Sequence, residues 1–286
     1  MICMKCFFFI LFMLFPSVLF SQKEQLLEPA VLEVHYRHTM QRDTIRKNTM
    51  ETDSMILRIG KNIRQFFSYH TFYYDSLWND PQGREKAEEL TLEALRMRDH
   101  SKRPQIRTTY DYLYTNYPTG KITVTNRRFV IGYVYDDEYL PQQWTVKDSV
   151  KHILGYPCRM ATCNFRGRNW VAWFAADIPV KSGPWKLSGL PGLILEAYDR
   201  NDDYHYTAVR IDKHNLRSVT FYNFEETAFL RTDRKRFLRS QRAFISGDPV
   251  NEIELIQEIM QKGLKSTYVQ REQRRLFYDF KERDYQ

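Results

Sequence analysis

Cysteine is scarce in this chain, and the motifs that bring histidine or cysteine to a metal ion are missing. Four cysteines occur in 286 residues, and the seven histidines form no His-Glu-x-x-His motif and no paired Cys/His spacing. A glycine-rich phosphate loop and a Gly-x-Ser-x-Gly elbow are also missing. The sequence therefore predicts no metal and no cofactor, and it assigns no catalytic residue.

Only two cysteines lie outside the N-terminal 22 residues, namely Cys158 and Cys163. The segment 156–165 has the pattern of a strand, in which residues five apart are separated by roughly 16 Å. A disulfide needs Cα atoms within about 7 Å. Either a tight turn at 160–161 interrupts the strand or both thiols stay free. We predict free, buried thiols, and Cys158 is kept only as a weak candidate for chemistry.

Long apolar runs are confined to the N-terminus. Residues 7–20 form an uncharged apolar segment that is preceded by Lys5 and followed by Ser21-Gln22. A spanning helix needs about 20 apolar residues, so the run is typical of a signal peptide cleaved next to Ser21. We expect residues 1–22 to be removed and the mature chain, 23–286, to be periplasmic or secreted. The alternative is an N-terminal membrane anchor.

Aromatic residues, in contrast, are abundant, at 15% of the chain with 19 Tyr and 19 Phe. This composition favours strands, and alternation such as that of Leu32, Val34 and Tyr36 indicates one buried face. We expect a single mainly β (α+β) domain, a curved antiparallel sheet or half-barrel with a few helices. The strand pattern resembles that of periplasmic lipoprotein carriers. Strands are predicted at 54–60, 63–68, 121–125, 128–135, 156–164, 170–175, 193–198, 204–212 and 218–223.

Helical spacing appears in two places. Ala87, Leu90, Ala94 and Met97 predict a charged surface helix near 81–101, either an insertion or a lid. The pattern also predicts a helical C-terminal region over 232–286, with segments at 232–244 and 252–264.

Part of the net charge of +8 comes from a cluster of basic residues at the segment 232–244. Such a basic helix either packs on the sheet by its aromatic face or lies against an anionic membrane surface or a partner. Export disfavours nucleic acid as a partner. The basic residues are Arg231, Arg234, Lys235, Arg236, Arg239 and Arg242, with Phe229, Phe237, Leu238 and Phe244 between them.

Glycine and proline number only 11 each, yet five of them fall within ten residues. The segment 183–196 reads GPWKLSGLPGLILE and resembles the GLPGLI family of exported bacterial proteins, named for residues 189–194. Similarity extends to 153–161 and 173–179. The family has no established activity, so the resemblance implies export and a structural motif. The motif residues are Gly183, Pro184, Gly189, Leu190, Pro191, Gly192, Leu193 and Ile194.

The motif is easier to interpret as architecture than as chemistry. We predict that Gly192 takes positive φ in a type II turn after Pro191, and that Leu190, Leu193 and Leu195 are buried. Within 183–196 the groups suited to acid, base or nucleophilic chemistry are Ser188 and Glu196.

Two functional classes remain. The first is a non-enzymatic binding, carrier or chaperone-like protein that holds a lipid, a peptide or an outer-membrane protein in an aromatic-lined cavity. The second is an exported hydrolase that uses Asp177 and Glu196 near the motif as paired carboxylates. A cavity lined by aromatic and aliphatic residues would favour the first class, and two facing carboxylates in a cleft would favour the second.

Overall fold

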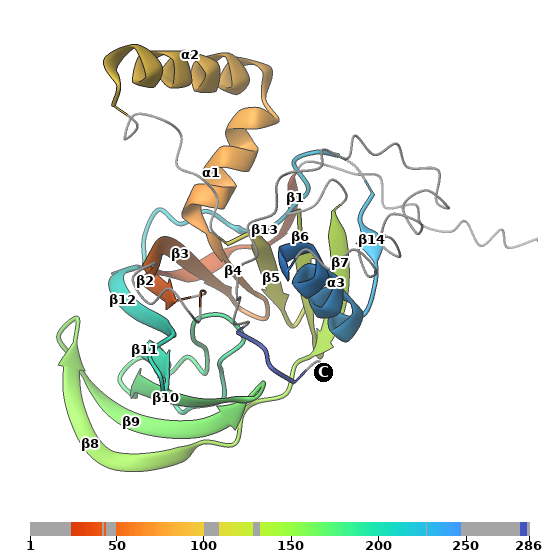
Figure 1. The fold of residues 1–286 in the computed structure, drawn as a ribbon. Coiled ribbons are helices and arrows are strands. Elements are labelled where there is room, and N and C mark those ends of the chain that lie inside the picture. The colour runs from red at the N-terminus through yellow and green to blue at the C-terminus, as the bar shows by residue number, and fades with distance from the viewer. Residues whose placement is uncertain are drawn as a thin grey trace, which may run out of the picture.

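A twelve-stranded curved sheet is the largest element of the described structure (Figure 1). The computed structural model describes residues 24–41, 43, 50–99, 109–127, 132–226, 228–246 and 281–284. The spatial order of the strands is β14-β7-β6-β5-β4-β3-β2-β12-β11-β10-β9-β8, and all neighbours are antiparallel except β14 and β7. The fold is thus mainly β with a large curved sheet, as predicted.

The strands of this sheet are β2 (Ala30–Gln41), β3 (Met50–Gly60), β4 (Arg64–Ser68), β5 (Asp111–Thr115), β6 (Lys121–Asn126), β7 (Tyr133–Glu138), β8 (Thr145–Ile153), β9 (Tyr156–Phe165), β10 (Arg168–Ala175), β11 (Leu193–Asp199), β12 (Tyr204–Asp212) and β14 (Leu230–Arg231). A separate two-stranded sheet pairs β1 (Glu24–Glu28) with β13 (Val219–Tyr222). The helices are α1 (Tyr69–Trp78), α2 (Pro81–Met97) and α3 (Arg234–Ser246).

Alternation along β2 separates the two faces of the sheet. Val34 and Tyr36 are buried in the main core on what we call the inner face. The opposite, outer face carries a second core that includes Ile56 and Phe67. Tyr222 from β13 packs into this second core, so the small sheet covers part of the outer face. The prediction that 218–223 continues the main antiparallel run was therefore wrong.

Two other elements depart from the predictions. No strand was predicted between residues 135 and 156, but residues 145–153 form β8, an edge strand whose side chains are mostly exposed. Without a buried face the strand lacks alternation, which explains the error. Helix α1 was not predicted, because its run of aromatic residues is typical of strands. Ser68 caps it by accepting a hydrogen bond from Thr71 N at 3.2 Å.

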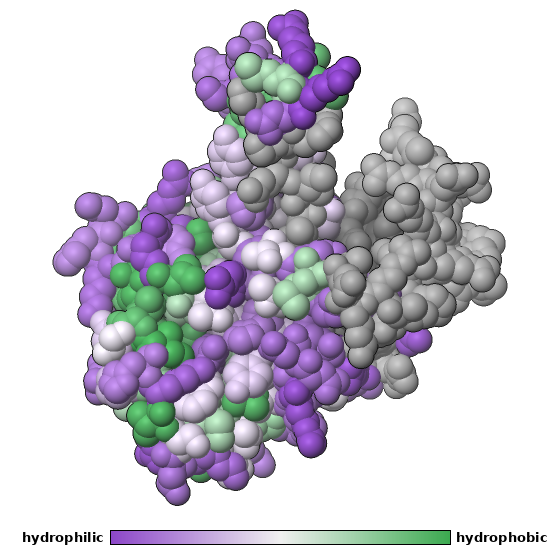
Figure 2. All heavy atoms as spheres, turned by 60° about the vertical axis from the view of Figure 1, so that its left-hand side comes forward, coloured by the Kyte–Doolittle hydropathy of each residue, from purple (hydrophilic) through white to green (hydrophobic). Residues whose placement is uncertain are grey.

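Helix α2 confirms the helix predicted near 81–101. Asp80 caps its first turn by accepting from Gly83 N at 2.6 Å, and Pro81 opens it. The helix packs on α1 and lies at the end of α1 that is far from the sheet, with a mainly hydrophilic surface (Figures 1 and 2). It does not cover the inner face, so the interpretation as a lid fails.

Helix α3 lies against the inner face in front of β5 to β7 (Figure 1). Phe237 packs on Tyr133 and Tyr135, with ring centroids 5.8 and 5.2 Å apart. This confirms that the basic helix packs on the sheet by its aromatic face. The described C-terminal residues, 281–284, are not helical, so the predicted helical region 232–286 is wrong there.

Two predictions concern segments outside the described residues. The signal peptide at 1–22 and the helix at 252–264 both fall there. Among the helices that are described, none combines the length and the apolar character needed to span a membrane.

Candidate functional site: a cavity on the inner face

The glycine- and proline-rich motif is part of the core. Leu190, Leu193 and Leu195 are at most 1% exposed, which confirms their predicted burial. Backbone bonds fix the path of the chain, from Leu193 N to Ile178 O at 3.0 Å and from Ile194 N to Ser182 O at 2.9 Å. The motif therefore serves as a rigid wall for the neighbouring side chains.

The predicted conformation of Gly192 was wrong. Its φ is not positive, whereas that of Gly189 is +95°. A Cβ on Gly192 would instead lie 2.2 Å from the carbonyl oxygen of Ala175. Glycine is required at this position because two backbone segments approach closely there.

Ser188 lies in the motif, and we expect its replacement by alanine to be nearly silent. Its hydroxyl is buried and has no hydrogen-bond partner among the described residues. Removing an unsatisfied polar atom should leave the free energy of unfolding unchanged or raise it by up to about 1 kcal/mol. Leu195→Ala, the comparison, should cost about 2–5 kcal/mol. Thermal denaturation checks both, and a loss of cellular function in Ser188→Ala at an unchanged melting temperature would contradict the structural interpretation.

The three weak candidates Asp177, Glu196 and Cys158 occupy one region of the sheet. Glu196 accepts hydrogen bonds from Lys151 and from His205 Nε2, the latter at 3.1 Å. Burial alone would raise the pKa of Glu196, but these two partners hold it below its ordinary value. An acid catalyst needs a raised pKa, so Glu196 is suited to an ion pair and not to proton donation.

The two thiols behave as buried hydrophobic groups. Cys158 and Cys163 lie on one continuous strand, β9, and both are free, as predicted. Burial raises the pKa of Cys158 to about 11 and that of Cys163 to about 12. Each is therefore a thiol at neutral pH and a poor nucleophile.

His205 gives this region a pH-dependent contribution to stability. Its hydrogen bond with Glu196 raises the pKa above the ordinary 6.5, burial opposes that rise, and Asp202 reinforces it. A raised folded pKa means that the stabilisation is fully present below pH 6.5 and is lost as the pH rises through the folded value.

We therefore expect His205→Gln to lower the melting temperature near pH 6 and to have a smaller effect near pH 9. Thermal denaturation at the two pH values measures this difference. His152→Gln, at an exposed histidine of β8, is the matched control. An effect of His205→Gln that does not change with pH would contradict the assigned ion pair.

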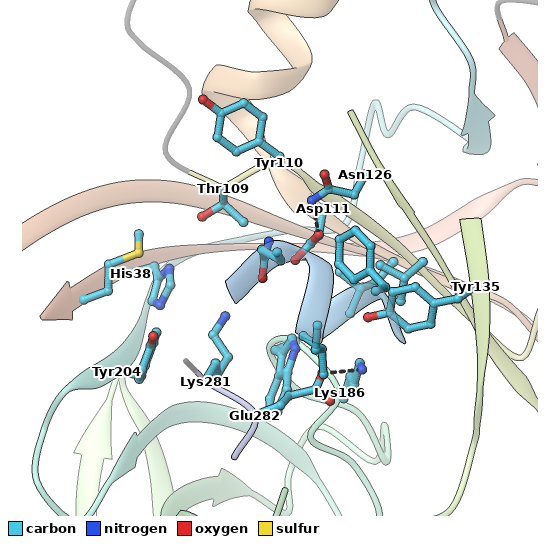
Figure 3. A pocket seen from close by; sticks show the side chains of 17 residues that line it. His38, Thr109, Tyr110, Asp111, Asn126, Tyr135, Lys186, Tyr204, Lys281 and Glu282 are labelled. Carbon is cyan, nitrogen blue, oxygen red and sulfur yellow. Dashed lines mark hydrogen bonds and ion pairs between the residues drawn. The ribbon is translucent and has the colours of Figure 1, made fainter. Parts of the chain in front are cut away.

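A cavity of about 80 Å³ lies between the inner face of the sheet and the elements that pack on it, which are α3, the motif and the segment 281–284 (Figure 3). That volume corresponds to about three water molecules at roughly 30 Å³ each. The wall consists of side chains from β2, β5, β6, β7 and β12, from the two residues before β5, and from α3, the motif and the C-terminal segment. These are His38, Met40, Thr109, Tyr110, Asp111, Leu113, Val124, Asn126, Tyr135, Trp185, Lys186, Tyr204, Phe237, Leu238, Gln241, Lys281 and Glu282.

The lining combines aromatic rings with a few fixed polar groups. His38 of β2 stacks on Tyr206 of β12 with ring centroids 4.1 Å apart. Tyr204, two residues before Tyr206 on β12, also stacks on His38. On the opposite wall Asn126 donates to Asp111 at 2.6 Å. Burial, followed by the nearby Glu282, raises the pKa of Tyr135, so its hydroxyl stays neutral. The cavity is therefore suited to orienting a small polar group between rings.

Six charged side chains, three of each sign, connect this cavity to the C-terminal segment. Lys186 Nζ contacts Asp137 at 3.0 Å and Glu282 at 2.5 Å. Arg234 Nη1 contacts Glu282 at 2.6 Å. We call this set the ion network; it comprises Arg166, Lys186, Arg234, Asp137, Glu282 and Asp284. It attaches the motif, α3 and the segment 281–284 to one another.

A second polar cluster lies on the outer face and was not foreseen from the sequence. His35 Nε2 is 3.0 Å from Glu33 and 3.1 Å from Asp212, a grouping of the size that holds metal ions. Arg58 and Arg210 bind the same two carboxylates at 2.7 and 2.9 Å. Because these arginines already neutralise the acids, we interpret the cluster as ion pairs.

Comparison with known proteins gives a partial match. Residues 115–235 match the model of a family described as N-glycanase peptide, N-terminal domain. The chain aligns with a structure of PNGF-II in space group P21, with 13% identity, a TM-score of 0.46, and 73% of this chain and 32% of that one covered. For the C2 form the values are 12%, 0.42, 71% and 30%. The chain thus spans about a third of those structures. No curated protein matches the chain.

Proposed function

We propose that the chain is an exported, non-enzymatic binding protein of the cell envelope, with a carrier or chaperone-like role, that holds its ligand in the inner-face cavity. The observation that carries the proposal is the cavity of about 80 Å³ with its aromatic walls. Lys186, Asp111 and Asn126 provide polar groups that can orient a ligand there.

The hydrolase alternative receives less support from the same geometry. Glu196, its central residue, is engaged by Lys151 and His205. Asp177 is exposed in the turn that follows β10. The match of residues 115–235 to an N-glycanase N-terminal domain does not favour hydrolysis over binding.

The proposal is tested by native mass spectrometry of the protein purified from the envelope. We expect an N-terminus near Gln22 and an additional mass that is non-covalently bound. Gln241→Trp, which fills the cavity from α3, should abolish the additional mass. Arg242→Trp, at the next and exposed position of α3, should keep it. An N-terminus at Met1 overturns the export, and no bound mass, or one retained by both variants, overturns the binding role.

A further inference from the structure

The C-terminal residues 281–284 enter the cavity from a distant part of the sequence. Arg168 Nε donates to Lys281 O at 3.1 Å, and Arg283 N donates to Arg166 O at 2.9 Å. The segment therefore docks by its backbone on the turn between β9 and β10. Lys281 and Glu282 then extend into the cavity, as Figure 3 shows.

Lys281 occupies an aromatic cage. Its ammonium lies 5.3 Å from the ring centroid of Trp185 and 5.5 Å from that of Tyr204, and it donates to the hydroxyl at the edge of the Tyr206 ring. Rings within about 6 Å of a cation attract it through their quadrupoles. Because the rings come from the motif and from β12, the cage belongs to the sheet and the cation belongs to the segment.

Glu282 occupies an adjoining anion site. Its two carboxylate oxygens contact Lys186 Nζ at 2.5 Å and Arg234 Nη1 at 2.6 Å. All three side chains are less than 10% exposed. Charge-assisted hydrogen bonds of this kind are strong and directional. The sheet, the motif and α3 thus present a receptor for a cation and an adjacent carboxylate.

We propose that this receptor is a binding site for peptides in which a lysine is followed by an acidic residue, and that Lys281-Glu282 occupies it as an internal ligand. The inference rests on the binding role proposed for the cavity and names its ligand class. A tethered segment reaches its site at an effective concentration near the millimolar range. A peptide in solution therefore binds the wild type more weakly than it binds a variant in which the docking of the segment is weakened.

The experiment uses the full chain and a fluorescein-labelled tetrapeptide with the sequence of residues 281–284, Lys-Glu-Arg-Asp. Fluorescence anisotropy should show binding to Lys281→Ala at least about ten times tighter than to the wild type, because the tethered competitor is weakened. Glu282→Gln, which keeps the side-chain shape, should also bind the tetrapeptide more tightly than the wild type does. It replaces Lys281→Ala as the test variant if Lys281→Ala does not fold. The peptide Ala-Ala-Arg-Asp should bind none of these proteins.

A matched pair of variants tests the cage. Lys281→Ala/Tyr204→Leu keeps apolar volume but removes a ring, and should lose the tetrapeptide. Lys281→Ala/Tyr69→Leu changes an exposed tyrosine of α1 and should retain it. Equal affinity of wild type and both single variants, or equal binding of the alanine peptide, overturns the inference. A bound mass in native mass spectrometry without tetrapeptide binding overturns this inference and leaves the binding role standing. If neither a bound mass nor tetrapeptide binding is found, this inference and the proposed binding role are both overturned.

Discussion

Gly192→Ala is expected to destabilise the protein by about 3 kcal/mol or more. The added Cβ would lie 2.2 Å from Ala175 O, 2.7 Å from Ala175 C and 2.9 Å from Ala176 Cα. All three atoms are backbone, so no side chain can move aside. Ala175 also pairs with Leu193, where β10 meets β11. Relief of the clash would therefore open the sheet at the buried motif.

Thermal denaturation measures the effect, which should lower the melting temperature by about 6–12 °C. Gly155→Ala is the matched control. Gly155 has φ +81° and no atom within 4 Å of its added Cβ, so only the conformational penalty of roughly 1–2 kcal/mol applies. An effect of Gly192→Ala no larger than that of Gly155→Ala would contradict close approach as the reason for glycine at position 192.

Gly192 also marks the limit of what the sequence can predict. The cluster of glycines and prolines indicates a constrained path, and the leucines indicate burial. The neighbour that forbids a side chain, Ala175, comes from another strand. Local turn rules therefore indicated correctly that position 192 needs glycine, but they gave the wrong physical reason for that need.

The same limit applies to the larger elements. Strands with one buried face, such as β2 and β9, can be predicted from the alternation of apolar residues or from aromatic content. The edge strand β8 and the aromatic helix α1 do not, because exposure removes the pattern in one and composition imitates a strand in the other.

The cavity was beyond sequence-based prediction for a related reason. Asp137, Lys186 and Glu282 look like ordinary surface charges, each in a different part of the chain. Only the curved sheet and the docked segment 281–284 bring them together. The sequence contained one weak indication of the cage. Tyr204 and Tyr206 are two residues apart in a predicted strand, so they share a face, and both line the cage.

Asp137→Asn tests the ion network, and we expect it to cost about 3–5 kcal/mol at neutral pH. Asp137 is only 8% exposed, and it binds Arg166 Nη2 through both oxygens, at 2.6 and 2.7 Å, and Lys186 at 3.0 Å. Neutralising it leaves three cations facing two remaining anions in a largely buried site. The unpaired positive charge, more than the lost hydrogen bonds, accounts for the size of the effect.

The cost should depend on pH in a defined direction. Burial alone would raise the pKa of Asp137, but Lys186 and Arg166 outweigh it and hold the pKa below the ordinary 3.8. A lowered folded pKa means that the stabilisation is present above pH 3.8 and is lost as the pH falls through the folded value. Urea unfolding of wild type and variant should therefore show a constant difference from about pH 7 to pH 5, which narrows below about pH 3.8.

Glu138→Gln is the matched control, since Glu138 is the next residue of β7 but its partner is the exposed Lys121. An exposed pair contributes about 0–1 kcal/mol, so this variant should unfold at nearly the wild-type urea concentration. If Asp137→Asn is equally mild, water must reach the network and screen it. The segment 281–284 would then be attached to the inner face mainly by its backbone bonds and by the packing of Lys281 in its cage.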